Sequence, residues 1–140
     1  MANVTPILAT PEALTLEPQS LDAALFLQGY HDFYLQKTDG SWPATDPAKS
    51  LARLMPALKS GAIVVVIDHV ANVGADPASD ANELHRIAPA LAKKDFEAAG
   101  LRFVADSAAF ANPQDDHTKI VFHPTVRHKT DQFMYKFRKP

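Results

Sequence analysis

The pattern of hydrophobic and polar residues predicts a sheet of mostly buried strands. Residues 63–67 are five consecutive β-branched residues, a pattern typical of a central parallel strand that is buried on both faces. Residues 21–28 form a second, largely apolar run, which also predicts a buried strand. Three further strands are predicted at residues 4–8, 101–105 and 132–137.

Proline and glycine positions predict the first long helix and its end. A helix is predicted from Pro47, because the missing N–H of proline does no harm at the first helical position. Pro56 lies inside this segment and is expected to end or kink the helix near Leu54 or Met55. Gly61 is expected to stop the segment before the next strand.

Two more helices are predicted between the later strands. Asp80 and Glu83 form a capping signature, which predicts a short helix that includes His85. Pro89 predicts the start of another helix, and Gly100 predicts its end. This alternation of strands and helices favours an α/β fold with a parallel sheet and right-handed crossovers.

Composition narrows the class of protein. The chain has 140 residues, 14 basic and 16 acidic, with a formal net charge of -2, so no basic field is available for nucleic acid. It has no cysteine, which excludes disulfides and thiolate nucleophiles. The longest apolar run is too short to span a membrane, and the first residues lack the pattern of a signal peptide. These features predict a single soluble domain, located in the cytoplasm, that binds neither membrane nor nucleic acid.

Pairs of aspartate and histidine follow the two most apolar strands. His31 and Asp32 come after residues 21–28, and Asp68 and His69 come after residues 63–67. Ligands of open α/β sheets bind in the crevice outside the carboxyl ends of the strands, so both pairs are expected at one site. An imidazole there is suited to general base catalysis or to orienting a substrate.

Each of these residues also has a purely structural interpretation. Asp32 would then cap the next turn, and Asp68 would accept hydrogen bonds from free N–H groups of its loop. If the helix after residue 80 folds over the crevice, His85 joins the other histidines. Otherwise its neighbour Arg86 would form a surface ion pair with Glu83, which contributes little to stability.

Several short polar motifs occur in an order that is shared with a known family. They are Gln28-Gly29-Tyr30-His31-Asp32-Phe33, Val66-Ile67-Asp68-His69 and Leu84-His85-Arg86-Ile87, followed by residues 115–118, 129–133 and 136–140. With these motifs the chain resembles the C-terminal half of a class I S-adenosylmethionine-dependent methyltransferase. More narrowly, it resembles a bacterial group known as predicted methyltransferases.

The resemblance implies a fold and a set of site residues. The five predicted strands would be strands three to seven of a partial Rossmann-like sheet with helices on its faces. The last strand would be antiparallel and inserted between strands five and six. The resemblance implies that five residues are catalytic and line the acceptor side of the site: His31, Asp32, Asp68, His69 and His85. The residues implied in contact with S-adenosylmethionine are Gln28, Gly29 and Tyr30.

The sequence departs from the family in its cofactor-binding part. The glycine-rich loop after strand one has no counterpart among the glycines at positions 29, 40, 61, 74 and 100, and Thr10 stands where an acid would face the adenine. Without that loop a single chain is not expected to hold the cofactor alone. Because strand one would pair with residues 21–28, this strand is expected to be an exposed apolar edge. The sequence therefore predicts a homodimer, or a separate N-terminal half as a partner.

Three functions remain open on this evidence. The first is methyl transfer to a small-molecule acceptor, with the missing cofactor half supplied by a partner or an oligomer. The second is a non-catalytic homo-oligomeric assembly or binding protein derived from a methyltransferase. The third is a metal-dependent hydrolase that uses Asp115, Asp116 and His117 with the other Asp/His pairs. Ligand spacing typical of metal sites is absent, so no metal ligands are predicted.

Overall fold

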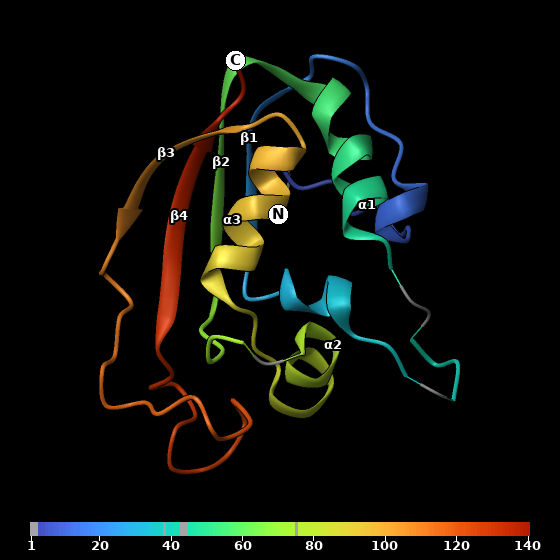
Figure 1. Ribbon diagram of the computed structural model, residues 1–140. Coiled ribbons are helices and arrows are strands. Elements are labelled where there is room, and N and C mark those ends of the chain that lie inside the picture. Colours follow the sequence, from blue (N-terminus) through green and yellow to red (C-terminus); the bar gives the residue numbers. More distant parts are fainter. Residues whose placement is uncertain (1–2, 38, 43–44, 75) are drawn as a thin grey trace.

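The computed structural model describes residues 3–37, 39–42, 45–74 and 76–140, and these form one four-stranded sheet (Figure 1). The strands are β1 (Leu21–Leu27), β2 (Leu58–His69), β3 (Arg102–Ser107) and β4 (Gln132–Arg138). Their order is β1-β2-β4-β3, with β1 parallel to β2 and β4 antiparallel to both of its neighbours. The predicted fold class and the insertion of an antiparallel last strand are confirmed.

Helices pack on one face of this sheet. The α-helices are α1 (Pro47–Leu54), α2 (Pro77–Ser79) and α3 (Pro89–Ala98). Short 3₁₀ helices occupy Pro11–Ala13, His31–Tyr34 and Met55–Ala57, and a π-helical turn occupies Asp80–Leu84. Figure 1 shows α3 next to the strands and α1 beside it, on the right, and both helices contribute to the core.

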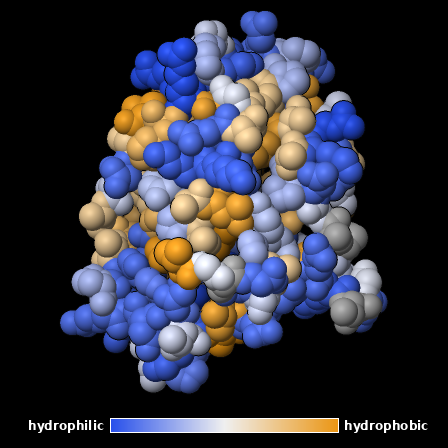
Figure 2. Space-filling model, viewed as in Figure 1, coloured by the Kyte–Doolittle hydropathy of each residue, from blue (hydrophilic) through white to orange (hydrophobic). Residues whose placement is uncertain are grey.

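The core lies between these two helices and the sheet. Val64 and Val66 of β2 are completely buried and face α3, where Phe96 stacks on Phe137 with ring centroids 5.2 Å apart. Residues on a strand alternate between the two faces of the sheet. Accordingly Leu25 of β1 points away from this core and is 63% exposed. Figure 2 shows the helix-bearing side, on which separate apolar patches emerge among hydrophilic residues.

The predicted end of the first helix is confirmed. Helix α1 ends at Leu54 and continues as a 3₁₀ turn that contains Pro56, because proline cannot donate the next helical hydrogen bond. Lys139, near the end of the chain, donates to the carbonyl groups of Met55 and Leu58, each at 2.6 Å. The first of these contacts satisfies a carbonyl group that the interrupted helix leaves free, and the second ties the end of the chain to the start of β2.

Two predictions about the sheet are wrong. Residues 4–8 are exposed and form no strand, since Pro6 lacks one backbone donor. Within the described part of the chain, the outer edge of β1 therefore has no partner strand. Gly61 does not stop the helix but lies within β2 with φ +80°. There the pairing moves from Leu21 with Leu58 to Ala23 with Ile63. The glycine therefore allows a bulge with positive φ, a backbone conformation that residues with a side chain rarely adopt.

The predicted capping box at Asp80 is also wrong. The helical segment begins earlier, at Pro77, where the Asp76 side chain accepts a hydrogen bond of 2.8 Å from the backbone N–H of Ser79. It ends in the π-helical turn at Leu84. His85 follows in the left-handed conformation, with φ 54°, so this histidine is not on the helix but on the turn that leaves it. Among the described residues no helix is long and apolar enough to cross a membrane.

Candidate active site

Asp68 organises the carboxyl ends of β1 and β2. Its carboxylate has no exposed surface, and it accepts hydrogen bonds from His31 Nδ1 at 2.8 Å and from the backbone N–H of His31 at 2.9 Å. It also accepts one from the backbone N–H of His69 at 2.8 Å. An ionised carboxylate only accepts hydrogen bonds. The ring proton of His31 therefore lies on Nδ1, and its Nε2 faces away from Asp68.

The chain after β1 holds His31 in this position. Gln28 adopts a left-handed conformation, with φ 56°, and its N–H donates to the carbonyl of Ile67 at 2.7 Å. Tyr30 is completely buried and donates its hydroxyl to Asp95 of α3 at 2.8 Å. The turn that carries His31 is thus fixed to the sheet on one side and to a helix on the other.

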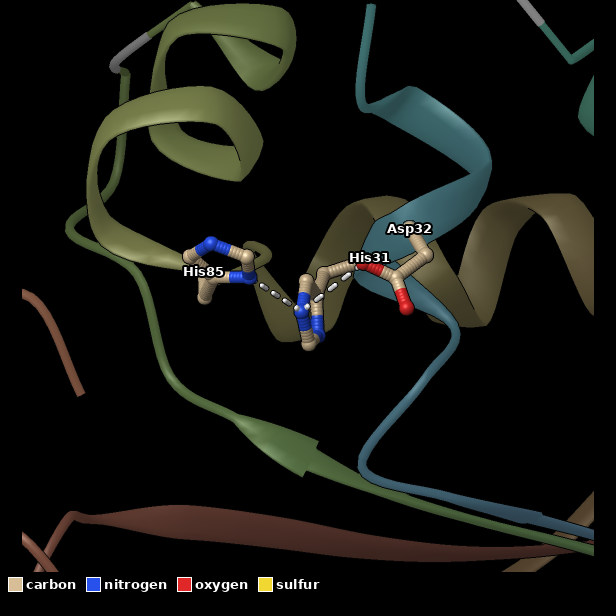
Figure 3. A group of neighbouring side chains, drawn as sticks. All are labelled: His31, Asp32 and His85. Atoms are coloured by element: carbon tan, nitrogen blue, oxygen red, sulfur yellow. Dashed lines mark hydrogen bonds and ion pairs between the residues drawn. The ribbon is translucent and has the colours of Figure 1, made fainter. Parts of the chain in front are cut away.

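His31, Asp32 and His85 converge beside this turn (Figure 3). His31 Nε2 lies 3.3 Å from His85 Nδ1 and 3.3 Å from Asp32 Oδ1. The three side chains come from two segments that are more than fifty positions apart, and the left-handed conformation of His85 turns its ring toward His31. Figure 3 shows His31 between His85 and Asp32, with one of its ring nitrogens linked to both.

The charges around His31 favour protonation of its ring over protonation of the ring of His85. Burial acts to lower the pKa of His31, but the hydrogen bond and charge of Asp68, with the charge of Asp32, outweigh it and raise the pKa above its usual value. Burial and the neighbouring His31 lower the pKa of His85. Of these two rings, His31 is the one that binds a proton more readily.

His69 is a neutral histidine in the same site. Burial lowers its pKa to about 4, with repulsion from His31 and Arg86 acting in the same direction. Its Nδ1 lies 2.8 Å from the hydroxyl of Thr130. Asp68 accepts a hydrogen bond from the backbone N–H of His69 and orients the ring of His31, not that of His69.

Two hollows adjoin this cluster. The smaller, of about 350 Å³, is lined by Gln28, His31, Asp32, Leu35, Lys37, Trp42, His69, His85, Val121 and Phe122. The larger, of about 590 Å³, is lined by Ala9, Thr10, Pro11, Glu12, Gly29, Asp32, Phe33, Trp42 and Thr45. Asp32 and Trp42 line both hollows, so the carboxylate of Asp32 lies at the boundary between them.

The residues expected to contact a cofactor fall in different places. Gly29 lines the larger hollow, whereas Gln28 lines the smaller one and donates to the side chain of Gln132 at 2.8 Å. Tyr30 is a core residue with no exposed surface, and its hydroxyl is bound to Asp95. A side-chain contact between Tyr30 and a ligand does not fit this placement.

Arg86 is not the surface residue that its helical spacing from Glu83 suggested. It is completely buried and binds both carboxylate oxygens of Asp115, at 2.9 and 3.1 Å. It also donates to the carbonyl groups of Val70 and Lys119, each at 3.0 Å. Asp115 is therefore engaged in a structural ion pair and is not available as a metal ligand in the loop that follows β3.

No protein-family model and no curated protein matches this sequence. The fold is similar to that of the cyclase SpnF, with a TM-score of 0.63 and 16% identity over 94% of this chain and 55% of SpnF. It is also similar to a SAM-dependent methyltransferase from Aquifex aeolicus, with a TM-score of 0.60 and 14% identity over 96% of this chain and 54% of that one.

A third similar structure is a Haloferax volcanii protein in complex with the Trm112 methyltransferase activator. Here the TM-score is 0.61, with 15% identity over 96% of this chain and 60% of the other. The chain thus has the Rossmann-like fold of SAM-dependent methyltransferases and spans just over half the length of these structures. Since SpnF is a cyclase, the fold does not by itself fix the reaction.

Proposed function

We propose that this chain takes part in S-adenosylmethionine-dependent methyl transfer to a small-molecule acceptor. The observation that carries the proposal is the pair of hollows that adjoin at Asp32. A methyl donor in the larger hollow and an acceptor in the smaller one would meet beside this carboxylate. Methyl transfer requires above all that donor and acceptor be held in line.

The larger hollow suits the methyl donor. Its walls include the aromatic side chains of Phe33 and Trp42, together with Thr10 and Pro11, which offer flat apolar surface to a purine ring. The sulfonium group of S-adenosylmethionine is positively charged. The carboxylate of Asp32 and the aromatic faces both attract such a cation, so we place the sulfonium near Asp32.

The smaller hollow suits the acceptor. His31 presents Nε2 to this side, with its Nδ1–H held by Asp68, an arrangement that allows the ring to accept a proton from an acceptor hydroxyl or amine. The acceptor lone pair would form the new bond to the methyl carbon as the carbon–sulfur bond breaks, and the displaced proton would pass to Nε2. Phe122 and Trp42 offer apolar wall for the body of the acceptor.

We propose that a second copy of the chain, or a polypeptide that carries the N-terminal half of the fold, completes the donor site. Strand β1 is the end strand of the sheet, with no partner on its outer edge among the residues that the structure describes. Leu25 and Leu27 on its outer face are 63% and 61% exposed. An apolar edge strand of this kind promotes association. The chain has no cysteine, which is consistent with our proposal of a cytoplasmic location.

A second candidate function rests on the same exposed leucines. If β1 associates with another copy and the donor hollow stays too open for the cofactor, the chain would be a non-catalytic homo-oligomeric assembly or binding protein. The metal-dependent hydrolase that used Asp115 is not carried forward, because Arg86 occupies that carboxylate.

Calorimetric titration with S-adenosylmethionine distinguishes these candidates. We expect micromolar binding, weakened about tenfold in Asp32→Asn because the variant loses the charge beside the sulfonium. The matched control is Asp22→Asn, which removes an exposed carboxylate of β1 that pairs with Lys59. The absence of binding at millimolar cofactor would contradict a donor site that a second copy completes, and would favour either the assembly protein or a half-enzyme that needs a separate partner.

A further inference from the structure

We propose that His31, Asp32 and His85 form a binding site for a divalent transition-metal ion of the zinc type. One ligand atom from each residue lies within 4.8 Å of those of the other two, and Figure 3 shows how the three groups point toward one another. Two imidazoles and one carboxylate make up a set of ligands that zinc and its neighbours bind readily.

Two of the three distances match tetrahedral coordination, whereas the third, between His85 and Asp32, is within 4.8 Å and would have to shorten when an ion binds. Zinc–nitrogen and zinc–oxygen bonds of roughly 2.0–2.1 Å place the ligand atoms of a tetrahedron about 3.3–3.4 Å apart. His31 Nε2 lies 3.3 Å from His85 Nδ1 and 3.3 Å from Asp32 Oδ1. Two edges of the tetrahedron are thus already present. An octahedral ion such as magnesium would require neighbouring ligands closer together, at about 3.0 Å.

The hydrogen bond to Asp68 prepares His31 for a cation at Nε2. Because Nδ1 carries the ring proton, neutral His31 presents a lone pair at Nε2, and the ionised carboxylate of Asp32 presents only lone pairs as well. Two acceptors 3.3 Å apart repel each other unless a cation lies between them. A proton on Nε2 can point at Asp32 or at His85 but not at both, whereas a metal ion binds all three groups.

The surroundings of the three residues resemble those of a supported metal site. A metal-binding histidine usually donates its second ring N–H to a carboxylate, which fixes the ring and makes it a better ligand. Asp68 does this for His31 and is completely buried. His85 directly precedes Arg86, whose buried ion pair with Asp115 fixes the chain at that point. The ligands therefore stand on segments that are held in place before any ion binds.

One coordination position would remain open toward the smaller hollow. Three protein ligands are typical of catalytic zinc, which leaves the fourth position to water or substrate. The hollow of about 350 Å³, which Trp42 and Phe122 also line, adjoins the cluster and leaves room for such a ligand. A divalent ion lowers the pKa of a bound hydroxyl group, so with the ion bound the acceptor would release its proton to solvent, and His31 Nε2 would serve as a ligand rather than as the base. We therefore infer that the acceptor is an oxygen nucleophile, an inference that rests on the proposed methyl transfer, whereas metal binding itself does not.

Cobalt(II) titration of the chelator-treated chain tests the site, because the visible absorption of cobalt distinguishes tetrahedral from octahedral coordination. We expect one tetrahedral cobalt ion per chain, displaced by zinc. Binding should weaken at least about tenfold in His85→Asn and in Asp32→Asn. Asparagine is tolerated at the left-handed position of His85. The matched control is His128→Asn, since His128 is exposed and also left-handed, with φ 64°, and it should bind as the wild type does.

Three results would overturn the site. They are cobalt bound only with octahedral coordination, cobalt bound as tightly by His85→Asn as by the wild type, and no binding of cobalt or zinc. Thermal unfolding of each variant checks that it is folded. The outcomes are separable from those of the proposed function. Metal binding without binding of S-adenosylmethionine would support the site and contradict methyl transfer. Cofactor binding without metal would leave His31 as the base and contradict the site.

Discussion

The carboxylate of Asp68 accepts hydrogen bonds from both the ring Nδ1–H and the backbone N–H of His31. Through these two bonds a single side chain joins the end of β2 to the turn that follows β1. The same bonds fix the tautomer of His31 and direct its Nε2 toward Asp32 and His85. The stability of the sheet end and the chemistry of the site therefore depend on the same contact.

Replacing Asp68 by asparagine tests this double role. Asparagine places an NH₂ group against N–H donors, so we expect the free energy of unfolding to fall by about 3 kcal/mol. Urea unfolding followed by circular dichroism measures this loss. Asp116→Asn, a change to an exposed aspartate, should alter stability by less than about 0.5 kcal/mol. Equal effects of the two changes would show that Asp68 does not hold the two strands together.

The Arg86–Asp115 ion pair is expected to be the second large contributor to stability. Arg86→Met leaves the buried carboxylate of Asp115 without its charged partner, at a cost of about 3–5 kcal/mol. Arg86→Lys should recover little, because lysine cannot form the two-point contact. A double-mutant cycle with Asp115→Asn should give a coupling energy above about 1 kcal/mol. Additive effects would contradict a direct pair.

The pKa of His69 predicts how stability depends on pH in the metal-free chain. The unfolded chain takes up a proton on this residue near pH 6.5, whereas the folded chain does so only near pH 4. The unfolded state thus binds more protons between these values, so stability is complete above about pH 6.5 and falls as the pH drops toward 4. The loss from this residue should be about 2–3 kcal/mol.

His69→Asn isolates this contribution in urea unfolding measured from pH 7 to pH 4. Asparagine keeps a donor near the Thr130 hydroxyl but does not titrate, so the slope of stability against pH should flatten. His31 acts in the opposite direction, because its raised pKa adds stability at low pH that is lost as the pH rises through that pKa. An unchanged slope in His69→Asn would show that His69 does not stay neutral in the folded chain.

The exposed edge of the sheet predicts association. We expect a homodimer at micromolar concentration, measured by light scattering coupled to size exclusion. Leu25→Lys and Leu27→Lys place charges on the outer face of β1 and should each shift the mass toward the monomer. Val73→Lys, at a loop residue that is also exposed, is the control and should not. A monodisperse wild-type monomer would contradict the dimer.

Local sequence patterns predicted most of the fold, because they depend on neighbouring residues. The β-branched run in β2 marked the central strand, and Pro47 and Pro89 marked the starts of α1 and α3. The errors arose where a partner elsewhere in the chain decides. Residues 4–8 could form a strand only by pairing with the edge of β1, and in the structure they do not pair with it. Whether Gly61 ends an element or bulges a strand depends on the register with β1.

The candidate site was only partly visible in the sequence for the same reason. Strand ends indicated that His31 and Asp68 would be near each other, because both follow parallel neighbouring strands. Nothing local indicated that Asp68 would hold His31 rather than His69, or that Arg86 would reach Asp115, since 29 positions separate the latter two. The left-handed backbone conformation of His85 turns its ring into the site. Such a conformation can be predicted from sequence mainly at glycine and asparagine, and not at a histidine.

The most direct test of the central claim locates the methyl donor on the chain. Backbone amide spectra recorded during titration with S-adenosylhomocysteine, the stable product of the donor, report which residues sense it. We expect saturable shifts of the amide signals of Gly29, Asp32 and Phe33, which line the larger hollow, and little change at Val73. No shifts at millimolar ligand, or shifts confined to residues away from that hollow, would contradict the claim.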